Sequence, residues 1–395
     1  MTVTEARIEL PTERDDRWHY APLDEITDRV ARSVRPSAGV PTSVSPSLIE
    51  SIVGTAGPRM VFVNGYYVAW LSDHGALPAG VRCDVSDADH ADRAGAAVVS
   101  VGDGVRFEEP IHVVHLAVPG AVDEPGALVS ARTIVDVGAG AHVTVVEAYA
   151  GLDGPSVADV TTSIRVGDRA DVAHYRIQNE ASAATHIGRT RIDQGADSAV
   201  RTTSVTVGGD VARNAIEVHL GAPDARIEIS GISVTGGHQR HDTVVTVDHA
   251  ASNCASSQRF IGVVDDHGRG AFSGEIIVRP GTTGTDAHQT SRNLVLDPNA
   301  EADARPWLTI LADDVRCTHG ATVGRLDEEA LHYLRSRGIA LGDARAMLID
   351  AFVRDVTDAI SHEPLREHVA ALVAAAASNA STTPAIDSAR STARP

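Results

Sequence analysis

Apolar and polar residues alternate in short runs through the middle of the chain, from about residue 95 to residue 300. Each run is three to seven residues long and is bounded by Gly, Asp or Ala, which is typical of strands separated by turns. The runs lie at 97–101, 112–118, 133–137, 142–146, 164–166, 205–207, 227–229 and 243–247. This pattern predicts a succession of short β-strands.

A weak repeat accompanies these strands. Four glycines, each followed after a few residues by an alanine, lie 29, 28 and 26 residues apart; they are Gly138, Gly167, Gly195 and Gly221. A strand-only unit of this length cannot bury both of its faces, so neighbouring units must stack on one another. The repeat therefore predicts a mainly β protein with a right-handed β-helix (solenoid) core. An ordinary β-sandwich with evenly spaced strands is the alternative that the pattern leaves open.

The two ends of the chain have a different texture. Residues 1–90 indicate a small mixed α/β region, with a helix at 24–34 and a hairpin at 60–70 around Asn64-Gly65. The β-helix core is expected over 91–322. Three- and four-residue apolar spacing then predicts a C-terminal helical domain over 323–377. Residues 378–395 are small and polar, and they are expected to form a disordered tail.

Composition narrows the possible functions. The 395-residue chain has a net charge of −19 and no lysine, so it lacks a phosphate-binding P-loop and its surface disfavours nucleic acid. GC-rich coding and adaptation to salt both explain this acidity. The three cysteines are too few for a disulfide framework. No signal peptide or membrane-spanning run is recognisable, which predicts a cytoplasmic protein.

A specific motif occupies residues 313–324, with the sequence DDVRCTHGATVG, and continues through 325–339. It resembles the C-terminal signature of the SufB/SufD family of iron–sulfur cluster assembly scaffolds. The segments 268–274, 292–296 and 306–312 are similar to other strands of that family, and the short N-terminus favours the D subunit. One departure is Thr309, which stands where the family usually has a glutamate.

The resemblance implies a non-catalytic scaffold subunit with two partners. SufB would form a heterodimer with the chain through the β-helix, and the SufC ATPase would dock on the helices at about 326–360. Partner contacts with SufC are expected from Leu331, Tyr333, Arg335, Arg337 and Phe352. A homodimer is an additional possibility when the chain is alone, because a β-helix has an exposed edge.

Cys317 and His319 are the candidate cluster ligands. Their spacing places both side chains on one face of a strand, where a thiol and an imidazole suit iron or sulfur. Because clusters usually take four protein ligands, we expect any iron–sulfur cluster here to be transient and completed by a partner chain. The resemblance assigns the histidine of this motif to the interface with SufB. The alternative is that Cys317 fills space and His319 is an ordinary strand residue.

Two other functions compete with this interpretation. A SufB-like paralogue would hold a nascent cluster itself, which the iron and sulfide content of the isolated chain would reveal. A β-helix enzyme acting on polysaccharide would need clustered carboxylates and aromatic platforms. Aromatic residues make up only 4% of the chain, which argues against this enzyme. Cys83, Cys254 and the remaining histidines are expected to be structural.

Overall fold

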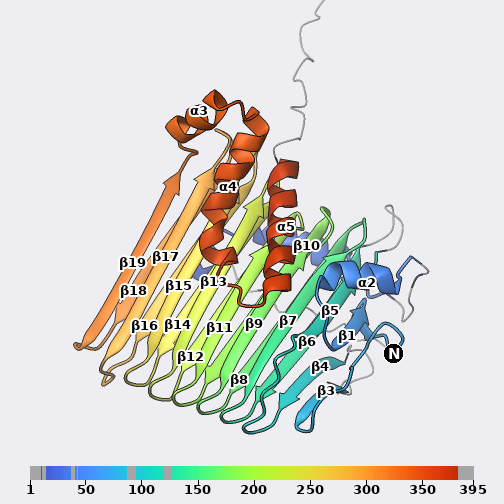
Figure 1. Cartoon of the computed structure of the whole chain (residues 1–395), viewed down its shortest axis with the longest axis vertical. Coiled ribbons are helices and arrows are strands. Elements are labelled where there is room, and N and C mark those ends of the chain that lie inside the picture. The colour runs from blue at the N-terminus through green and yellow to red at the C-terminus, as the bar shows by residue number, and fades with distance from the viewer. Residues whose placement is uncertain are drawn as a thin grey trace, which may run out of the picture.

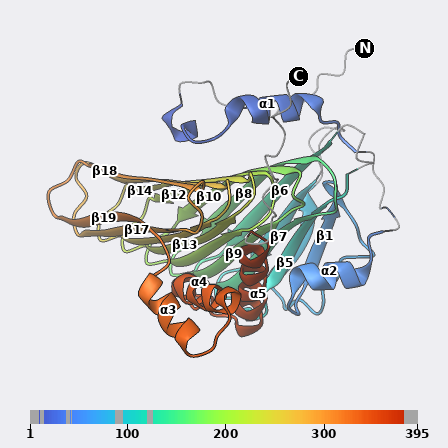
Figure 2. The ribbon, with the colours of Figure 1, turned by 90° about the horizontal axis from the view of Figure 1, so that it is seen from above.

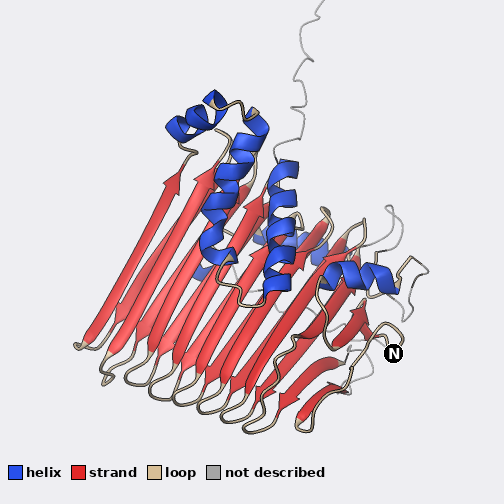
Figure 3. Ribbon diagram, viewed as in Figure 1, coloured by secondary structure: helices blue, strands red, loops and turns tan. Residues whose placement is uncertain are grey.

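The chain winds into stacked coils, and each coil contributes one strand to each of two facing sheets (Figures 1 and 3). The structure is a computed structural model that describes residues 10, 15–36, 41, 43–86, 95–119 and 126–380. The ten-stranded sheet contains, in spatial order, β19 (Val315–Gly324), β17 (Thr285–Val295), β15 (Ala255–Val264), β13 (Arg226–Thr235), β11 (Ala199–Thr206), β9 (Asp171–Asn179), β7 (His142–Gly151), β5 (Ile111–Ala117), β1 (Arg59–Val63) and β2 (Tyr66–Tyr67). The nine-stranded sheet contains β18 (Glu301–Ile310), β16 (Arg269–Val278), β14 (Arg240–His249), β12 (Val211–Leu220), β10 (Ala184–Gln194), β8 (Ser156–Val166), β6 (Ala127–Val137), β4 (Ala96–Val101) and β3 (Val81–Ser86).

Strands from successive coils pair in parallel throughout the described residues, for example Ile192 of β10 with Ile164 of β8 and Val218 of β12. The two strand pairs near the N-terminus, β1–β2 and β3–β4, are antiparallel. Parallel pairing between one coil and the next confirms the predicted β-helix and excludes the alternative β-sandwich, whose sheets are antiparallel.

The repeated glycines lie in turns that stack directly on one another. Gly138 and Gly167 follow strands β6 and β8, as the repeat predicts. A Cβ atom at Gly167 would lie 2.7 Å from the Ala139 backbone nitrogen, and one at Gly138 would lie 2.5 Å from Asp103 Oδ1. Each turn therefore approaches its neighbour too closely for a side chain, which explains why glycine recurs once per coil.

Within the described residues, five α-helices and one short 3-10 helix lie outside the two sheets: η1 (Asp16–Trp18), α1 (Leu23–Arg32), α2 (Pro46–Val53), α3 (Glu328–Ser336), α4 (Leu341–Thr357) and α5 (Glu363–Ala380). Figure 2 shows α1 on the side of the nine-stranded sheet and the other α-helices on the opposite side. Val353 and Val369 belong to the apolar cluster between α4, α5 and the ten-stranded sheet. None of the helices in the described ranges is long and apolar enough to cross a membrane.

Some segments differ from the sequence-based expectation. The hairpin at Asn64-Gly65 forms, with φ values of 53° and 84°, but β1 and β3 continue the two sheets of the solenoid. Helix α5 continues to Ala380, and residues 381–395 of the expected tail lie outside the described residues. Most strands have eight to eleven residues, longer than the predicted runs.

The composition of the interior explains why the runs of alternating residues in the sequence are shorter than the strands of the structure. Along one side it is dry, because Val, Ile and Ala side chains of both sheets meet there. Along the other side the inward positions are polar: β9 turns His174, Arg176 and Gln178 inward, all fully buried. Hydrophobic alternation is lost over such stretches even though the strand continues.

Glu147 is the centre of this polar interior. It accepts hydrogen bonds from the Tyr149 hydroxyl at 2.9 Å and from the Thr162 hydroxyl at 2.9 Å, and it pairs with His174 Nε2 at 2.9 Å. Burial alone would raise the pKa of Glu147, but the His174 hydrogen bond and the other partners hold it at about 2. The carboxylate is therefore charged inside the solenoid and fully paired.

Candidate functional site

The last coil leaves one end of the solenoid open. Strands β18 and β19 each have a neighbour on one side only, since each ends its sheet. Neither contains a buried residue, whereas the preceding strand β17 buries more than half of its residues. Ten-residue edge strands of this kind present unpaired backbone donors and acceptors to any chain that can continue the sheet.

Cys317 and His319 both lie on β19, on the face that points into the solenoid. Cys317 is in register with the buried Ala287 of β17, and His319 is in register with the buried Gln289. The structure therefore brings the two side chains to one face, as their spacing predicts. Both side chains therefore lie at the edge of the ten-stranded sheet, where a further strand could pair with β19.

Their environments differ. Cys317 is half-buried and packs with Val315 against the apolar cluster of Ile276, Val278 and Ala287. Burial, followed by the negative charge of Asp286, raises the pKa of the Cys317 thiol, so it is protonated at neutral pH. His319 is exposed and has no hydrogen-bond or ion-pair partner among the described residues. Its imidazole is thus available to a ligand from outside the chain.

Polar residues of neighbouring coils surround this end of the chain. His288 hydrogen-bonds the Thr318 hydroxyl at 2.7 Å and pairs with Asp286 at 2.9 Å, on the opposite face of the strand. The Thr309 hydroxyl donates to Glu275 Oε1 at 3.0 Å. The carboxylate that the sequence lacks at position 309 is therefore supplied next to it from β16, one coil earlier. Sequence spacing gives no sign of this proximity, because it depends on the register of the coils.

The other two cysteines are less suited to ligand chemistry. Cys83 and Cys254 are both buried. Burial raises the pKa of Cys83 to about 11 and also raises that of Cys254. The Cys254 thiol donates to the Ala222 carbonyl oxygen at 3.3 Å. Across the described parts of the chain, no group of three or more His, Cys, Asp and Glu side chains is arranged to hold a metal ion.

The predicted partner residues on the C-terminal helices divide into two groups. Tyr333 is 57% exposed at the end of α3, and the Arg337 guanidinium lies 5.1 Å from the centre of its ring. Arg335 is exposed beside them, and Leu331 is half-buried. Phe352 lies elsewhere: it packs against the ten-stranded sheet under Arg292, which lies 4.9 Å from its ring centre.

Two further apolar side chains of α4 are exposed and were not predicted. Leu341 is 46% exposed and Met347 is 50% exposed. With Tyr333 they are the exposed apolar side chains of α3 and α4, and we call these three residues the helical surface. Helical periodicity alone cannot distinguish these residues from core residues, because the side of α4 that faces α5 and the sheet is equally apolar.

Comparison with known proteins gives a consistent result. The family described as "SUF system FeS cluster assembly, SufBD core domain" matches residues 121–352. The chain is 30% identical to the iron–sulfur cluster assembly protein SufD of Escherichia coli, over 93% of this chain and 89% of the relative. It is also 30% identical to an iron–sulfur cluster assembly SufBD family protein of Synechocystis, over 89% of this chain and 84% of the relative. A SufBD family protein of Mycobacterium leprae is 28% identical, over 92% and 90% of the two chains.

Proposed function

The chain belongs to the SufBD family of the SUF system, and from that premise we propose that it is a SufD-like, non-catalytic scaffold subunit of iron–sulfur cluster assembly. In this proposal the open end of the solenoid pairs with SufB, and the helical surface binds the SufC ATPase. The observation that carries the proposal is the exposed last coil, where Cys317 and His319 share a face. A SufB-like chain that holds the cluster by itself is the alternative.

The open end suits a partner that is itself a β-helix. A partner strand placed beside β18 or β19 would continue the sheet and satisfy its free backbone groups. Apolar side chains at this end, including Ile310, Leu311 and Val323, are 39%, 55% and 55% exposed. Burying them against a second chain removes apolar surface from water, at about 25 cal/mol per Å².

A cluster at this interface is cargo rather than a resident cofactor in our proposal. The chain offers one thiol and one imidazole there, and a cluster usually needs four ligands. The remaining ligands would come from SufB. Because the pKa of Cys317 is raised, its thiol would lose its proton only when iron or a nearby positive charge stabilises the thiolate. His319 therefore makes the stronger contribution from this chain before a cluster arrives.

Charge substitution at the open end tests the SufB contact. Val323→Asp places a carboxylate on an exposed position, so the isolated chain stays folded, but association would bury that charge. We expect co-purification with SufB to fall sharply, while Val34→Asp, at the similarly exposed Val34 (52%), leaves it unchanged. Undiminished association of Val323→Asp would refute the proposed contact.

His319→Ala tests the ligand role separately. The complex should still assemble, and its iron and sulfide content after anaerobic reconstitution should fall. Normal cluster content in that variant would remove His319 from the site. Iron and sulfide bound stoichiometrically by the isolated chain would favour the SufB-like alternative.

Tyr333→Ala tests the helical surface. We expect it to weaken SufC binding, since an exposed aromatic side chain commonly anchors an interface. The matched control is Tyr66→Ala, which removes an exposed tyrosine at the other end of the solenoid. Equal SufC binding by the two variants would contradict the docking proposal.

A further inference from the structure

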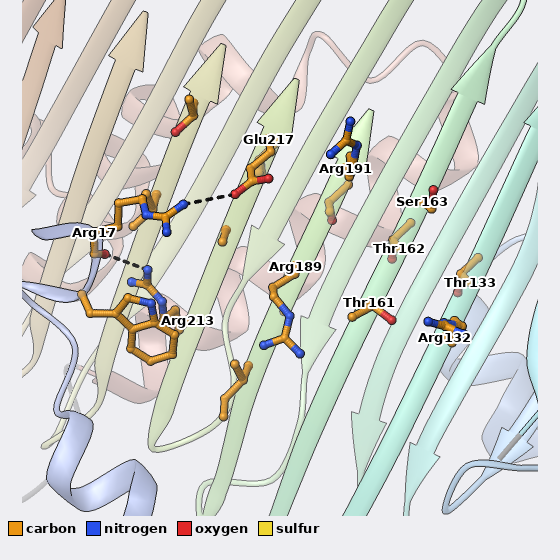
Figure 4. A pocket seen from close by; sticks show the side chains of 18 of the residues that line it. Arg17, Arg132, Thr133, Thr161, Thr162, Ser163, Arg189, Arg191, Arg213 and Glu217 are labelled. Atoms are coloured by element: carbon orange, nitrogen blue, oxygen red, sulfur yellow. Dashed lines mark hydrogen bonds and ion pairs between the residues drawn. The ribbon is translucent and has the colours of Figure 1, made fainter. Parts of the chain in front are cut away.

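A groove runs across the outer face of the nine-stranded sheet. Its floor is formed by β6, β8, β10, β12 and β14, and one wall by the segment before α1, including Arg17 and Trp18. Its volume is about 720 Å³. Figure 4 shows arginine and hydroxyl side chains of these elements gathered in the groove. The residues that line it belong to neither the terminal strands β18 and β19 nor the helical surface.

Arginines converge on this groove in an otherwise acidic chain. Six of the 34 basic residues line it: Arg17, Arg132, Arg165, Arg189, Arg191 and Arg213. Five of them come from four successive coils, so stacking of the solenoid brings together residues that are far apart in sequence. Guanidinium groups are the side chains best suited to bind planar or tetrahedral oxyanions through paired N–H donors.

The strand register arranges part of this set around a hydroxyl group. Thr161 of β8 is in register with Arg132 of β6 on one side and with Arg189 of β10 on the other. One row further along, Ser163 is in register with Arg191. Neighbouring strands are about 4.8 Å apart, so Arg132 and Arg189 are about 10 Å apart at their backbones. Two long guanidinium side chains can meet an oxyanion over Thr161 across that span.

Carboxylates balance most of the arginines, so the donors that remain decide what can bind. Arg165, Arg191 and Arg213 pair with Asp136, Asp193 and Asp242. Arg189 contacts Asp159 through Nη2 alone, which leaves its Nε and Nη1 donors. Arg17 pairs with Asp15 and Glu217.

Arg132 differs from these five, because it is exposed and has no hydrogen-bond or ion-pair partner within the described residues. Arg132 is therefore the lining arginine whose guanidinium donors are all free, and it lies beside Thr161.

We propose that this groove binds a phosphate-class oxyanion, held between Arg132 and Arg189 over the Thr161 hydroxyl, with the Ser163 hydroxyl extending the site to a second phosphoryl group. The ligand is inorganic pyrophosphate or the diphosphate of a nucleotide. The Arg213 guanidinium stacks on one face of the Trp18 ring, 4.0 Å from the ring centre, so that face is not free to stack on a base. Recognition therefore rests on the phosphoryl groups, and it is independent of the scaffold role proposed above.

The test is calorimetric titration of the full chain with inorganic pyrophosphate at low ionic strength, repeated with ADP and with adenosine. We expect pyrophosphate and ADP to bind and adenosine not to bind. Arg132→Gln and Arg189→Gln should each weaken binding about tenfold or more, as expected for loss of a charged hydrogen-bond donor. Arg226→Gln, at an exposed arginine that begins β13 on the other sheet, should leave binding unchanged.

Three results would overturn the proposal. They are absence of pyrophosphate binding to the wild-type chain, binding that Arg132→Gln and Arg189→Gln leave intact, and equal loss in Arg226→Gln, which would indicate a non-specific charge effect. If ADP binds and pyrophosphate does not, the oxyanion is not the recognised group and the proposal also fails. Circular dichroism of each variant shows whether a loss of binding follows from loss of fold.

Discussion

Mild acid should unfold the isolated chain, because burial keeps several of its histidines from taking up protons. Burial lowers the pKa of His112, His115, His241 and His249 from 6.5 to about 4. Their exposed fractions are between 0% and 5%. In the unfolded chain these imidazoles bind protons below pH 6.5, while in the folded chain they stay neutral until about pH 4. Stability is therefore complete above pH 6.5 and falls as the pH drops toward 4.

The magnitude follows from the shifts. One pKa unit corresponds to about 1.4 kcal/mol, so each histidine removes about 3 kcal/mol of unfolding free energy by pH 4. Asp242 acts in the opposite direction, because burial raises its pKa from 3.8 to about 6 and the folded chain takes up its proton first. The net difference is about three protons between pH 6 and pH 4, or about 4 kcal/mol per pH unit. Below pH 4.5 Glu147 adds to the loss, since its folded pKa is about 2.

Urea denaturation followed by circular dichroism at several pH values between 7.5 and 5 measures this slope. A typical domain has 5–15 kcal/mol to lose, so the folded state should fail near pH 5. His249→Gln should reduce the slope by about one proton, because glutamine does not titrate. The matched control is His238→Gln, at an exposed histidine in a turn, which should leave the slope unchanged. A wild-type slope below one proton, or equal slopes in both variants, would refute this account.

Three further predictions concern packing in the isolated chain, and urea unfolding measures each. Gly167→Ala should lower the free energy of unfolding by about 1–3 kcal/mol, because the new Cβ would meet backbone atoms of the preceding turn. Gly320→Ala, which has open space around it, should change that free energy by less than about 0.5 kcal/mol. Equal effects of the two substitutions would contradict the stacked-turn explanation. Phe260→Ala should cost about 3–5 kcal/mol, since Phe260 is buried between the sheets, and a cost below about 1 kcal/mol would show that the interior collapses around it. Arg213→Met should lower the free energy of unfolding by about 3–5 kcal/mol, because it leaves Asp242 buried without its partner. Adding Asp242→Asn should restore part of that stability. If it restores none, the loss comes from packing and not from the unpaired charge.

The sequence was sufficient to predict the architecture because the features that define a β-helix are local. Glycine recurs where the turns stack, as at Gly138 and Gly167. Valine alternates with other residues along the strands whose side chains form the apolar part of the interior. The Asn64-Gly65 turn needs two positive φ values, which these two residues adopt readily. Side chains point to alternate faces along a strand, and this rule alone was enough to predict that Cys317 and His319 share one face of β19.

What the sequence could not predict depends on register between coils. The run of β9 through His174, Arg176 and Gln178 does not look like a buried strand in the sequence. Its polar groups find partners outside β9, which are Glu147 of β7, His186 of β10 and Glu180. In the same way, Glu275 reaches Thr309 from another coil, a contact that no spacing reveals. The position of Phe352 beneath Arg292 likewise depends on how α4 packs against the ten-stranded sheet.

The polar side of the interior has a consequence for how the coils find their register. The dry side presents similar valines and isoleucines in every coil, so apolar contact alone distinguishes poorly between the native stacking and one shifted by a whole coil. Glu147 differs from these residues, because its only suitable partners are Thr162, Tyr149 and His174. A shift of β9 by one coil would separate His174 from this carboxylate and leave the buried charge without its ionic partner, at a cost of several kcal/mol. The buried Glu147–His174 pair therefore favours the native register over a shifted one.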